Sequence, residues 1–381
     1  MKLLFVHDFS AEYYDGKYYS MGFSYKIWER YLNVFDELLI SSRFKQGNQA
    51  KDTNESSGRN VNFRPITSYK APISLIFNHK DIIEKLTLSI KESDGVLIRV
   101  PSMLGFIAAI ICQKLGKKYM VEVVGAAFDA FWFHGSFYGK ALSFPMEVLQ
   151  KRAVKHASVA IYVTKLYLNN KYPCKGKEYS GISNVQDIAI TKKNLDIRKN
   201  VKVGLIGSTY VDYKGHDVAI KAIKELKDQG LPVSLEIVGE GPNPKFLQLA
   251  KNLNLEDEII FKGKIYGKEL LNNWFKTLDF YIQPSLTEGH CRAIVEAIGN
   301  GLPTLASKAG GNSDSVNEEF LFQPKDYKKL AKLIKYLYES KSLREKNVEE
   351  NQYNISIYDA KKLQHRREEA LNSYKKIISN Q

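Results

Sequence analysis

The sequence predicts an α/β protein of two domains, each a parallel sheet covered by helices. The chain of 381 residues is longer than one hydrophobic core usually serves, which favours two domains. Short apolar runs alternate with longer amphipathic stretches, the pattern of parallel strands joined by helices. The pattern restarts after residue 200, so we expect two separate sheets.

The first half contains apolar runs of strand length between stretches with helical periodicity. The run that opens the chain ends at Asp8, which suits a first strand and is too short for the apolar region of a secretory signal. The expected strands are Lys2–Val6, Glu37–Ile40, Gly95–Val100, Tyr119–Val124 and Val159–Val163, and the expected helices are Ser20–Phe35, Asp81–Ser93 and Ser102–Leu115.

The second half opens with VKVGLIGS at Val201, followed by the strand-like runs VSLEIVG, EIIFKG, DFYIQ and PTLAS. A polar stretch precedes it, so we place the domain boundary within 184–200. The expected domains are residues 1–184, on the acceptor side, and 185–355, which binds the donor. The charged stretch 356–381 is expected to be helical over 356–378 and to pack back on the first domain.

Composition and charge limit the possible functions. Cys112, Cys174 and Cys291 show no paired spacing, so we expect neither disulfides nor a zinc site. No apolar stretch reaches the about 20 residues of a membrane-spanning helix, which favours a cytoplasmic protein. The net charge of +14 suits phosphorylated substrates or peripheral contact with the anionic inner face of the plasma membrane. Basic residues are spread over many helices without an RNA-binding motif, so we expect no nucleic-acid partner.

Residues 284–311 contain the arrangement of a binding site. They read PSLTEGHCRAIVEAIGNGLPTLASKAGG and predict a strand end, a Glu-Gly loop, a helix from about His290, a glycine stop and a further strand. In open α/β sheets ligands lie beyond the carboxyl ends of strands, where a helix N-terminus offers unpaired N–H groups to an anion. The segment therefore predicts a diphosphate site.

Two glutamates in this segment have the spacing of binding residues. Glu288 and Glu296 lie eight residues apart, which is about 12 Å along a helix. A retaining glycosidase needs its two carboxylates about 5–5.5 Å apart, so they are not an acid and a nucleophile. The spacing suits one carboxylate on sugar hydroxyls and the other on ribose hydroxyls.

The E-x7-E pattern, followed by a Gly, a Pro, a short strand and Gly-Gly, resembles the donor site of the retaining glycosyltransferases of family four. Four further motifs follow that family's order and approximate spacing: DYKGHDVAIKAIKEL, LEIVGEGP, FKGKI and DFYIQPS. The resemblance implies the GT-B fold, in which two Rossmann-like domains have parallel sheets facing a central cleft.

Site roles are implied by this resemblance. Glu296 is the expected ribose ligand, Glu288 the sugar-hydroxyl ligand and Lys214 the diphosphate ligand. Gly263 is expected to border the base, and Gly310–Gly311 to let the backbone pass close to the donor. The backbone amides expected to face the sugar and the phosphates are those of Gly289, His290, Cys291 and Arg292.

Two departures from the family pattern affect the donor site. Many members have an arginine after the strand that ends at Gly207, and this chain has Ser208 and Thr209 instead. Either these hydroxyls or another basic side chain, such as Arg292, must then serve the leaving phosphate. Many members read Glu-Gly-Phe-Gly where this chain reads EGHC, so we expect a different sugar selectivity.

The first half offers weaker candidates. Gly22 resembles the family's glycine loop after strand one, and His134 lies where the family often has a histidine near the reaction centre. An aromatic cluster, FDAFWFHGSFYGK, ends at Lys140 and has two interpretations. It is either a lip for a lipid-linked acceptor at an anionic membrane or ordinary core packing.

The expected function is retaining transfer of a hexose-type sugar from a UDP-, GDP- or similar nucleotide sugar to a saccharide or a lipid-diphosphate-linked saccharide. No DxD motif occurs, so we expect no metal and no cofactor. A nucleotide-sugar 2-epimerase of similar architecture, or a basic protein that binds membranes or nucleic acid without catalysis, remains the alternative. A NAD-dependent oxidoreductase is disfavoured because neither half has G-x-G-x-x-G between a strand and a helix.

Overall fold

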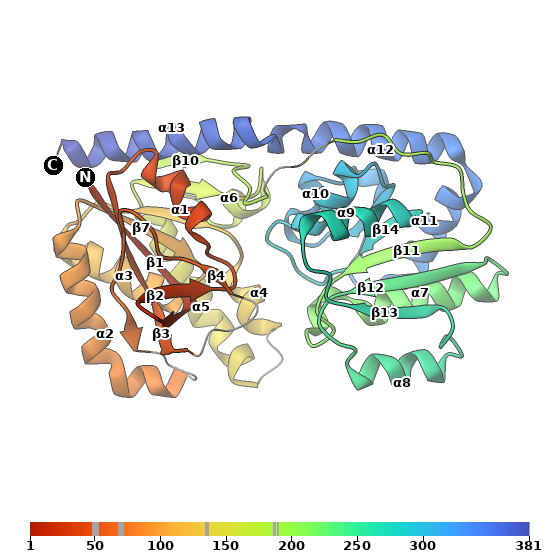
Figure 1. Ribbon diagram of the computed structural model, residues 1–381, viewed down its shortest axis with the longest axis horizontal. Helices are drawn as coiled ribbons and strands as arrows, with labels where there is room; N and C mark the ends of the chain where they lie inside the picture. The colour runs from red at the N-terminus through yellow and green to blue at the C-terminus, as the bar shows by residue number, and fades with distance from the viewer. Residues whose placement is uncertain (48–52, 68–71, 134–136, 186–187, 189, 381) are drawn as a thin grey trace.

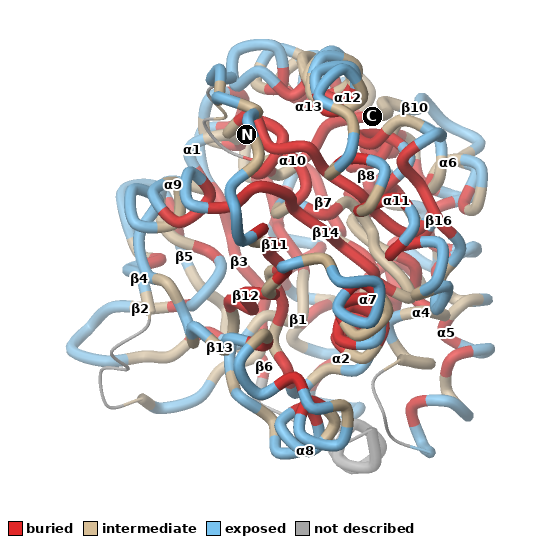
Figure 2. The backbone as a smooth tube through the Cα atoms, turned by 90° about the vertical axis from the view of Figure 1, so that its right-hand side faces the viewer, coloured by how far each residue is buried: buried red, intermediate tan, exposed pale blue. Residues whose placement is uncertain are grey.

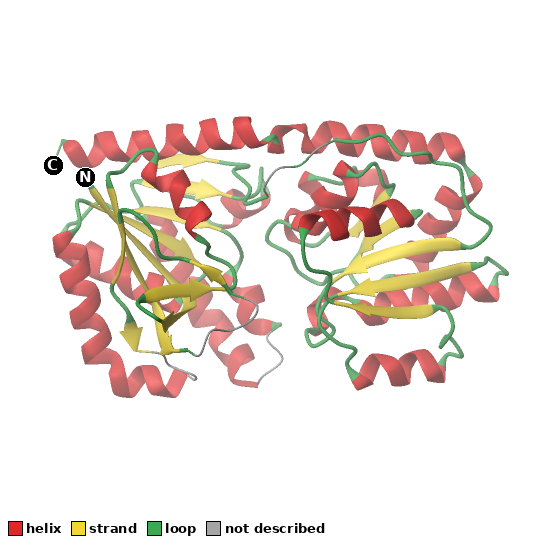
Figure 3. Ribbon diagram, in the orientation of Figure 1, coloured by secondary structure: helices red, strands yellow, loops and turns green. Residues whose placement is uncertain are grey.

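The computed structural model describes residues 1–47, 53–67, 72–133, 137–185, 188 and 190–380. Two halves lie side by side, and each has one sheet between helices (Figures 1 and 3). In the first sheet the order β10-β9-β8-β7-β1 continues from β1 to both β3 and β2, and the second sheet has the order β13-β12-β11-β14-β15-β16. The predicted α/β fold with two largely parallel sheets is therefore confirmed.

The first half contains every predicted strand and helix, with shifted ends. Its strands are β1 Lys2–Tyr14, β2 Lys17–Ser20, β3 Glu37–Gln46, β4 Asn54–Glu55, β5 Val61–Phe63, β6 Ile66–Thr67, β7 Gly95–Val100, β8 Met120–Val123, β9 Val159–Tyr162 and β10 Lys177–Tyr179. Its helices are α1 Tyr25–Leu32, α2 Pro72–Glu92, α3 Met103–Leu115, α4 Ala127–Trp132, α5 Phe137–Lys155 and α6 Tyr167–Lys171.

The second half follows the predicted alternation closely, and the neighbouring strands of its sheet all pair in parallel. Its strands are β11 Val201–Ile206, β12 Val233–Val238, β13 Ile259–Gly263, β14 Phe280–Gln283, β15 Thr304–Ser307 and β16 Leu321–Phe322. Its helices are α7 His216–Asp228, α8 Pro244–Asn252, α9 Lys268–Thr277, α10 Arg292–Gly299, α11 Tyr327–Glu339 and α12 Lys341–Ile355, with short 3₁₀ turns η1 Asp212–Lys214, η2 Gly310–Asp314 and η3 Glu318–Phe320.

The beginning of the chain differs from the sequence-based expectation. The first strand continues past Val6 to Tyr14, through an irregularity in its pairing with β3, and then turns back into β2. The turn is made by Asp15 and Gly16, both with positive φ, as a tight two-residue hairpin requires. Because β2 occupies Lys17–Ser20, the helix expected from Ser20 begins only at Tyr25.

The C-terminal stretch is helical as predicted, with one interruption. A short turn, η4 Ser356–Tyr358, separates α12 from α13 Ala360–Ser379, whose first N–H groups are capped by the Asp359 carboxylate. Helix α13 lies along the first half, beside α1 and β9 (Figure 1). The Tyr374 hydroxyl accepts a hydrogen bond from the Val96 amide at 2.8 Å and donates one to the Lys118 carbonyl at 3.1 Å.

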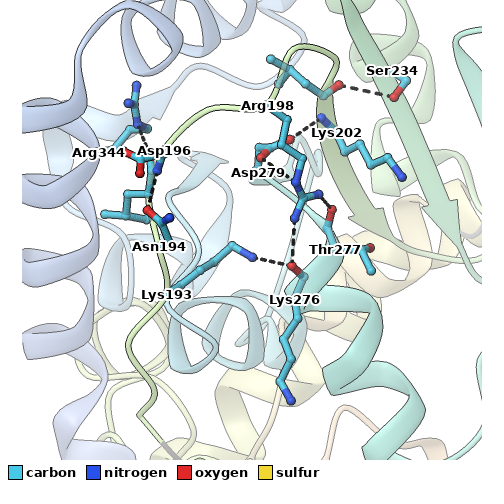
Figure 4. A network of polar contacts seen from close by, with 12 residues as sticks. Lys193, Asn194, Asp196, Arg198, Lys202, Ser234, Lys276, Thr277, Asp279 and Arg344 are labelled. Atoms are coloured by element: carbon cyan, nitrogen blue, oxygen red, sulfur yellow. Dashed lines mark hydrogen bonds and ion pairs between the residues drawn. The ribbon is translucent and has the colours of Figure 1, made fainter.

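The polar stretch before β11 lies against the second half (Figure 4). Lys193 donates to the Lys276 carbonyl at 2.6 Å, and Arg198 lies 3.8 Å from the Asp279 carboxylate. Arg344 of α12 donates to the Leu195 carbonyl at 2.8 Å. These contacts attach residues 193–198 to the elements of the second sheet. The exact domain boundary within 184–200 stays a prediction.

The central strands of both sheets form the buried interior, while edge strands such as β4 and the outer surfaces of the helices are exposed (Figure 2). Among the described residues, no helix combines the length and the apolarity needed to cross a bilayer. The described part of the chain also contains no group of three His, Cys, Asp or Glu side chains placed to hold a metal ion.

Candidate functional site

The segment 284–311 follows β14, whose neighbours in the second sheet are β11 and β15. In Figure 1 the arrowheads of β11 and β12 point toward the first half, so the carboxyl ends of these parallel strands face it. A loop from Pro284 to Cys291 leads into α10, and η2 follows β15. This is the edge at which open α/β sheets bind their ligands.

An ion pair lies at the centre of this edge. Lys214 Nζ is 2.7 Å from Glu288 Oε1, and the two side chains are only 18% and 9% exposed. Burial by itself lowers the pKa of Lys214, but the Glu288 carboxylate more than offsets this and raises that pKa above its usual value. A fixed positive charge is thus held beside the loop that precedes α10.

The chain brings these two residues together through glycine and backbone contacts. Gly215, which follows η1, has a φ of 73°, and a Cβ there would lie 2.0 Å from the Pro284 carbonyl oxygen. The Leu286 amide donates to the Tyr213 carbonyl at 2.7 Å. Only glycine permits this approach, which places the loop containing Lys214 against the loop containing Glu288.

A chain of hydrogen bonds between buried polar side chains ends on the Glu288 carboxylate. Tyr281 donates to Gln283 at 2.6 Å, Gln283 Nε2 donates to Ser285 Oγ at 2.8 Å, and Ser285 Oγ donates to Glu288 Oε1 at 2.7 Å. Tyr281, Gln283 and Ser285 are all fully buried. Hydrogen bonds in such low-dielectric surroundings fix the direction of the carboxylate. The sequence did not single out Gln283 or Ser285.

The second predicted glutamate has different surroundings. Glu296 lies on α10 one turn after Arg292, and it is half-buried. Burial raises the pKa of the Glu296 carboxyl, while the positive charges of Arg292 and Lys268 oppose that shift. Lys268, which begins α9, was not identified from the sequence. Its position directly after Gly267 at a helix start was the available signal.

Glycines allow the backbone segments that form the site to come into contact. Gly310 has a φ of 54°, and a Cβ there would lie 1.7 Å from the Glu288 carbonyl oxygen. The Gly311 amide donates to the Gly289 carbonyl at 3.0 Å. Gly263, at the end of β13, has a φ of 69° and open space where a Cβ would stand. The predicted Gly-Gly pair thus holds the loop of Glu288 in place.

The loop before α10 also touches the first half of the molecule. Thr287 Oγ1 donates to Asp129 Oδ2 of α4 at 2.9 Å. A Cβ on Gly289 would lie 2.3 Å from the Val124 carbonyl oxygen. The turn η2, which packs against this loop through Gly310, makes a further contact, since the Lys165 amide donates to the Asp314 carboxylate at 2.5 Å. These partners are far apart in the sequence, and no local pattern identified them.

His290 and Cys291 have packed surroundings. The two ring nitrogens of His290 lie 3.0 Å from Ser183 Oγ and 3.5 Å from Ser315 Oγ, and Tyr358 packs edge-on against the ring. Burial, with a smaller effect of Lys165, lowers the pKa of His290 to about 4. Burial and the Glu288 charge raise the pKa of the Cys291 thiol to about 12, so this thiol is protonated at neutral pH.

The hydroxyls that stand where many family members have an arginine are engaged within the protein. Thr209 is buried, and its Oγ1 donates to the Glu240 carbonyl and accepts from the Asn243 amide, both at 2.9 Å. Ser208 is half-buried, and its Oγ accepts from the Tyr210 amide at 3.3 Å. Thr209 therefore has no hydroxyl proton left for a phosphate in this conformation.

The candidate residues of the first half, Gly22, His134 and the aromatic cluster, make fewer contacts that bear on a binding role. Gly22 lies in an exposed bend between β2 and α1, where a Cβ would meet no atom within 4 Å. His134 lies outside the described residues. The aromatic cluster divides: Phe128 and Trp132 are half-buried and stacked at 5.3 Å, while Phe137 and Tyr138 are 82% and 72% exposed. Neither core packing nor a lip describes all of it.

Known proteins resemble this chain in sequence and in fold. The model of the family "Glycosyl transferases group 1" matches residues 187–354. "Protein CapJ" of Staphylococcus aureus is 65% identical over 380 residues, covering 100% of this chain and 97% of the relative. A GDP-mannose-dependent alpha-mannosyltransferase of Corynebacterium glutamicum is 38% identical over 86 residues, which are 23% of this chain and 19% of that protein.

Solved structures agree on the fold. Anabaena Alr3699/HepE in complex with UDP superposes with a TM-score of 0.69 at 19% identity, covering 98% of this chain and 100% of that one. The lipopolysaccharide outer core galactosyltransferase WaaB in its apo form gives 0.68 at 13% identity, covering 98% and 99%. Because the family model and a relative at 65% identity over the full length both match it, the chain belongs to the group 1 glycosyl transferases, family four, and it has the GT-B fold.

Proposed function

We propose that this glycosyltransferase moves a hexose-type sugar from a nucleotide-diphosphate donor to a saccharide or a lipid-linked saccharide, with retention and without a metal. The observation that carries the proposal is the Lys214–Glu288 pair beside the N-terminus of α10, with Glu296 further along the same helix. The complexes of Alr3699/HepE with UDP and with UDP-glucose support a nucleotide-sugar donor.

In this proposal Lys214 and the N-terminus of α10 stabilise the negative charge that develops on the leaving diphosphate. Lys214 and Ser285 both donate to Glu288 Oε1. Its other oxygen, Oε2, is then the acceptor for a sugar hydroxyl. Glu296 accepts from the ribose hydroxyls, and Gly263 borders the base.

The missing arginine is replaced, in this proposal, by Arg292 and Lys268. Both lie close enough to Glu296 to act on its charge, while Thr209 is occupied within the protein. The amides of residues 289–292 face the donor, and Gly22 and His134 contribute from the first half. We further propose that the protein acts in the cytoplasm, in assembly of a capsule or a related bacterial polysaccharide, as the relative named CapJ suggests.

The test is sugar transfer, or donor hydrolysis, by Lys214→Met, Glu288→Gln and Glu296→Gln. We expect kcat to fall about 100-fold or more for Lys214→Met, because a group that stabilises a leaving charge contributes that much. We expect a similar fall for Glu288→Gln, because the carboxylate that holds Lys214 and accepts from the sugar hydroxyl is lost. Glu296→Gln is expected to raise the donor KM, since ribose binding is shared by ground and transition states. The matched controls are Lys245→Met and Glu240→Gln, on exposed side chains of the same half. Near-parental activity in all three site variants would refute the assignment.

A further inference from the structure

Helix α5 exposes an apolar strip that no part of the fold covers in the described structure. Phe137 is 82% exposed, Phe144 63% and Val148 65%. The exposed Ala141, Phe144 and Val148 follow Phe137 by four, seven and eleven residues, so all of them lie on one side of the helix. Tyr138, 72% exposed, lies at the edge of this strip. Surface helices of soluble domains normally show polar residues on this side.

Basic side chains border the strip. Within the described range 137–155, the charged residues that are exposed are Lys140, Lys151, Arg152 and Lys155, and none of the exposed residues is acidic. The acidic Glu147 is half-buried and accepts from the Tyr172 hydroxyl at 2.5 Å, with Lys151 at 3.5 Å. The outward face of α5 is thus apolar from Phe137 to Val148 and positive at its sides and at its C-terminal end.

Aromatic side chains of α4 pack against the exposed face of α5. Phe144 packs edge-on against Phe128 at 5.2 Å, and Lys140 Nζ lies 5.8 Å from the Trp132 ring. Arg152 Nε donates to Gln113 at 2.9 Å, which holds its guanidinium beside the helix. Amphipathic helices with aromatic residues and basic edges bind in the plane of the bilayer interface.

We propose that this face of α5 docks on an anionic lipid bilayer. The apolar strip enters the interface, while Lys140, Lys151, Arg152 and Lys155 contact phospholipid headgroups. Charge complementarity selects this occupant over a second copy of the chain. Two copies paired through the same face would bring their basic residues together, which opposes association.

The location of the face connects it with the donor loop. Helix α5 packs against α4, and Asp129 of α4 accepts the hydrogen bond from Thr287, the residue before Glu288. A bilayer under α5 therefore lies one helix away from the loop of Glu288. An acceptor carried on a membrane lipid would approach the site from this side.

Vesicle flotation of the full chain tests the proposal without requiring any enzymatic activity. The vesicles contain phosphatidylcholine alone, or phosphatidylcholine with phosphatidylglycerol. We expect flotation with the anionic vesicles only, and less of it as salt is raised. Phe137→Ser/Val148→Ser, and separately Lys140→Glu/Lys151→Glu/Lys155→Glu, are each expected to lower the partition coefficient about tenfold or more, because both apolar insertion and basic contacts contribute.

Matched variants change the same residue types on other surfaces. Leu247→Ser/Tyr353→Ser alters two exposed apolar side chains of α8 and α12, and Lys328→Glu/Lys329→Glu/Lys332→Glu reverses three exposed charges of α11. Both controls are expected to float like the parent. Equal flotation of parent and α5 variants, or no flotation of the parent with anionic vesicles, would overturn the proposal. So would light scattering that shows a dimer split by Phe137→Ser/Val148→Ser.

Discussion

At the scale of single residues, the donor site depends on how a half-buried lysine and a half-buried glutamate, Lys214 and Glu288, stabilise each other. Removing either partner leaves an uncompensated charge in a poorly hydrated place, which costs far more than the net contribution of the pair. Ser285 and Gln283 add directed hydrogen bonds beneath Glu288. The carboxylate therefore has one orientation before any substrate binds.

Ser285→Ala tests this orientation. The change removes the donor to Glu288 Oε1 and the acceptor of the Gln283 amide, so we expect kcat to fall about tenfold, with a loss of about 1–2 kcal/mol in the free energy of unfolding. Donor KM should change little, since Ser285 does not reach the ligand. Ser234→Ala, at the start of β12, is the control. A kcat equal to that of the parent would show that Ser285 does not position Glu288.

At the scale of elements, the loop between β14 and α10 is held by backbone contacts that need glycine. Gly310 touches Glu288, and Gly215 touches Pro284. The sequence predicted the loop and the helix from E-x7-E and the Gly-Gly pair. It could not predict the partners of Thr287 and Gly289, because these lie on the first half of the chain and depend on how the two halves meet.

Gly310→Ala measures the contact with Glu288. Both Gly310 and Gly230 have positive φ, but only at Gly310 would a Cβ meet an atom within 4 Å. Urea unfolding should show a loss of about 1 kcal/mol for Gly230→Ala from backbone conformation alone, and a clearly larger loss for Gly310→Ala. Equal losses would mean that the loop moves aside at no cost.

The first half shows where local patterns were insufficient. Residues Lys2–Val6 gave a clear strand signal, but the continuation of β1 to Tyr14 contains polar residues and was not predicted. The Asp15-Gly16 dipeptide is a known hairpin signal and was available. The lip that was one interpretation of the aromatic cluster includes Phe137 and Tyr138, but the continuation of this exposed face along α5 to Val148 was not predicted. In a sequence, apolar residues at helical spacing look the same whether they face a core or the solvent.

At the scale of the whole molecule, the two halves and the C-terminal helix meet around His290. Its ring contacts Ser183 of the first half and Tyr358 of the turn before α13. Arg367 of α13 donates to the Ser183 carbonyl at 3.0 Å. The segment that crosses between the sheets is therefore fixed from both sides, and the protonation state of His290 affects this junction.

Acid should weaken this junction. Because the pKa of His290 is lowered to about 4, the folded protein binds this proton only near pH 4, while the unfolded chain binds it near pH 6.5. Stability is thus lost as pH falls from about 6.5 to about 4, by up to about 1.4 kcal/mol per pH unit from this residue. His290→Asn should flatten the pH dependence of unfolding relative to the parent, and the exposed control His365→Asn should not. Parallel curves for parent and His290→Asn would contradict this account.

The segment from Pro284 to Gly311, together with Lys214, is proposed to hold the nucleotide-sugar donor. Titration calorimetry with a panel of nucleoside diphosphates and their sugars tests it directly. We expect one nucleotide family to bind the parent, with affinity reduced about tenfold or more in Lys214→Met and in Glu296→Gln and unchanged in Lys245→Met. Binding that is equal in the parent and in both site variants, or no binding of any nucleotide sugar, would contradict the claim.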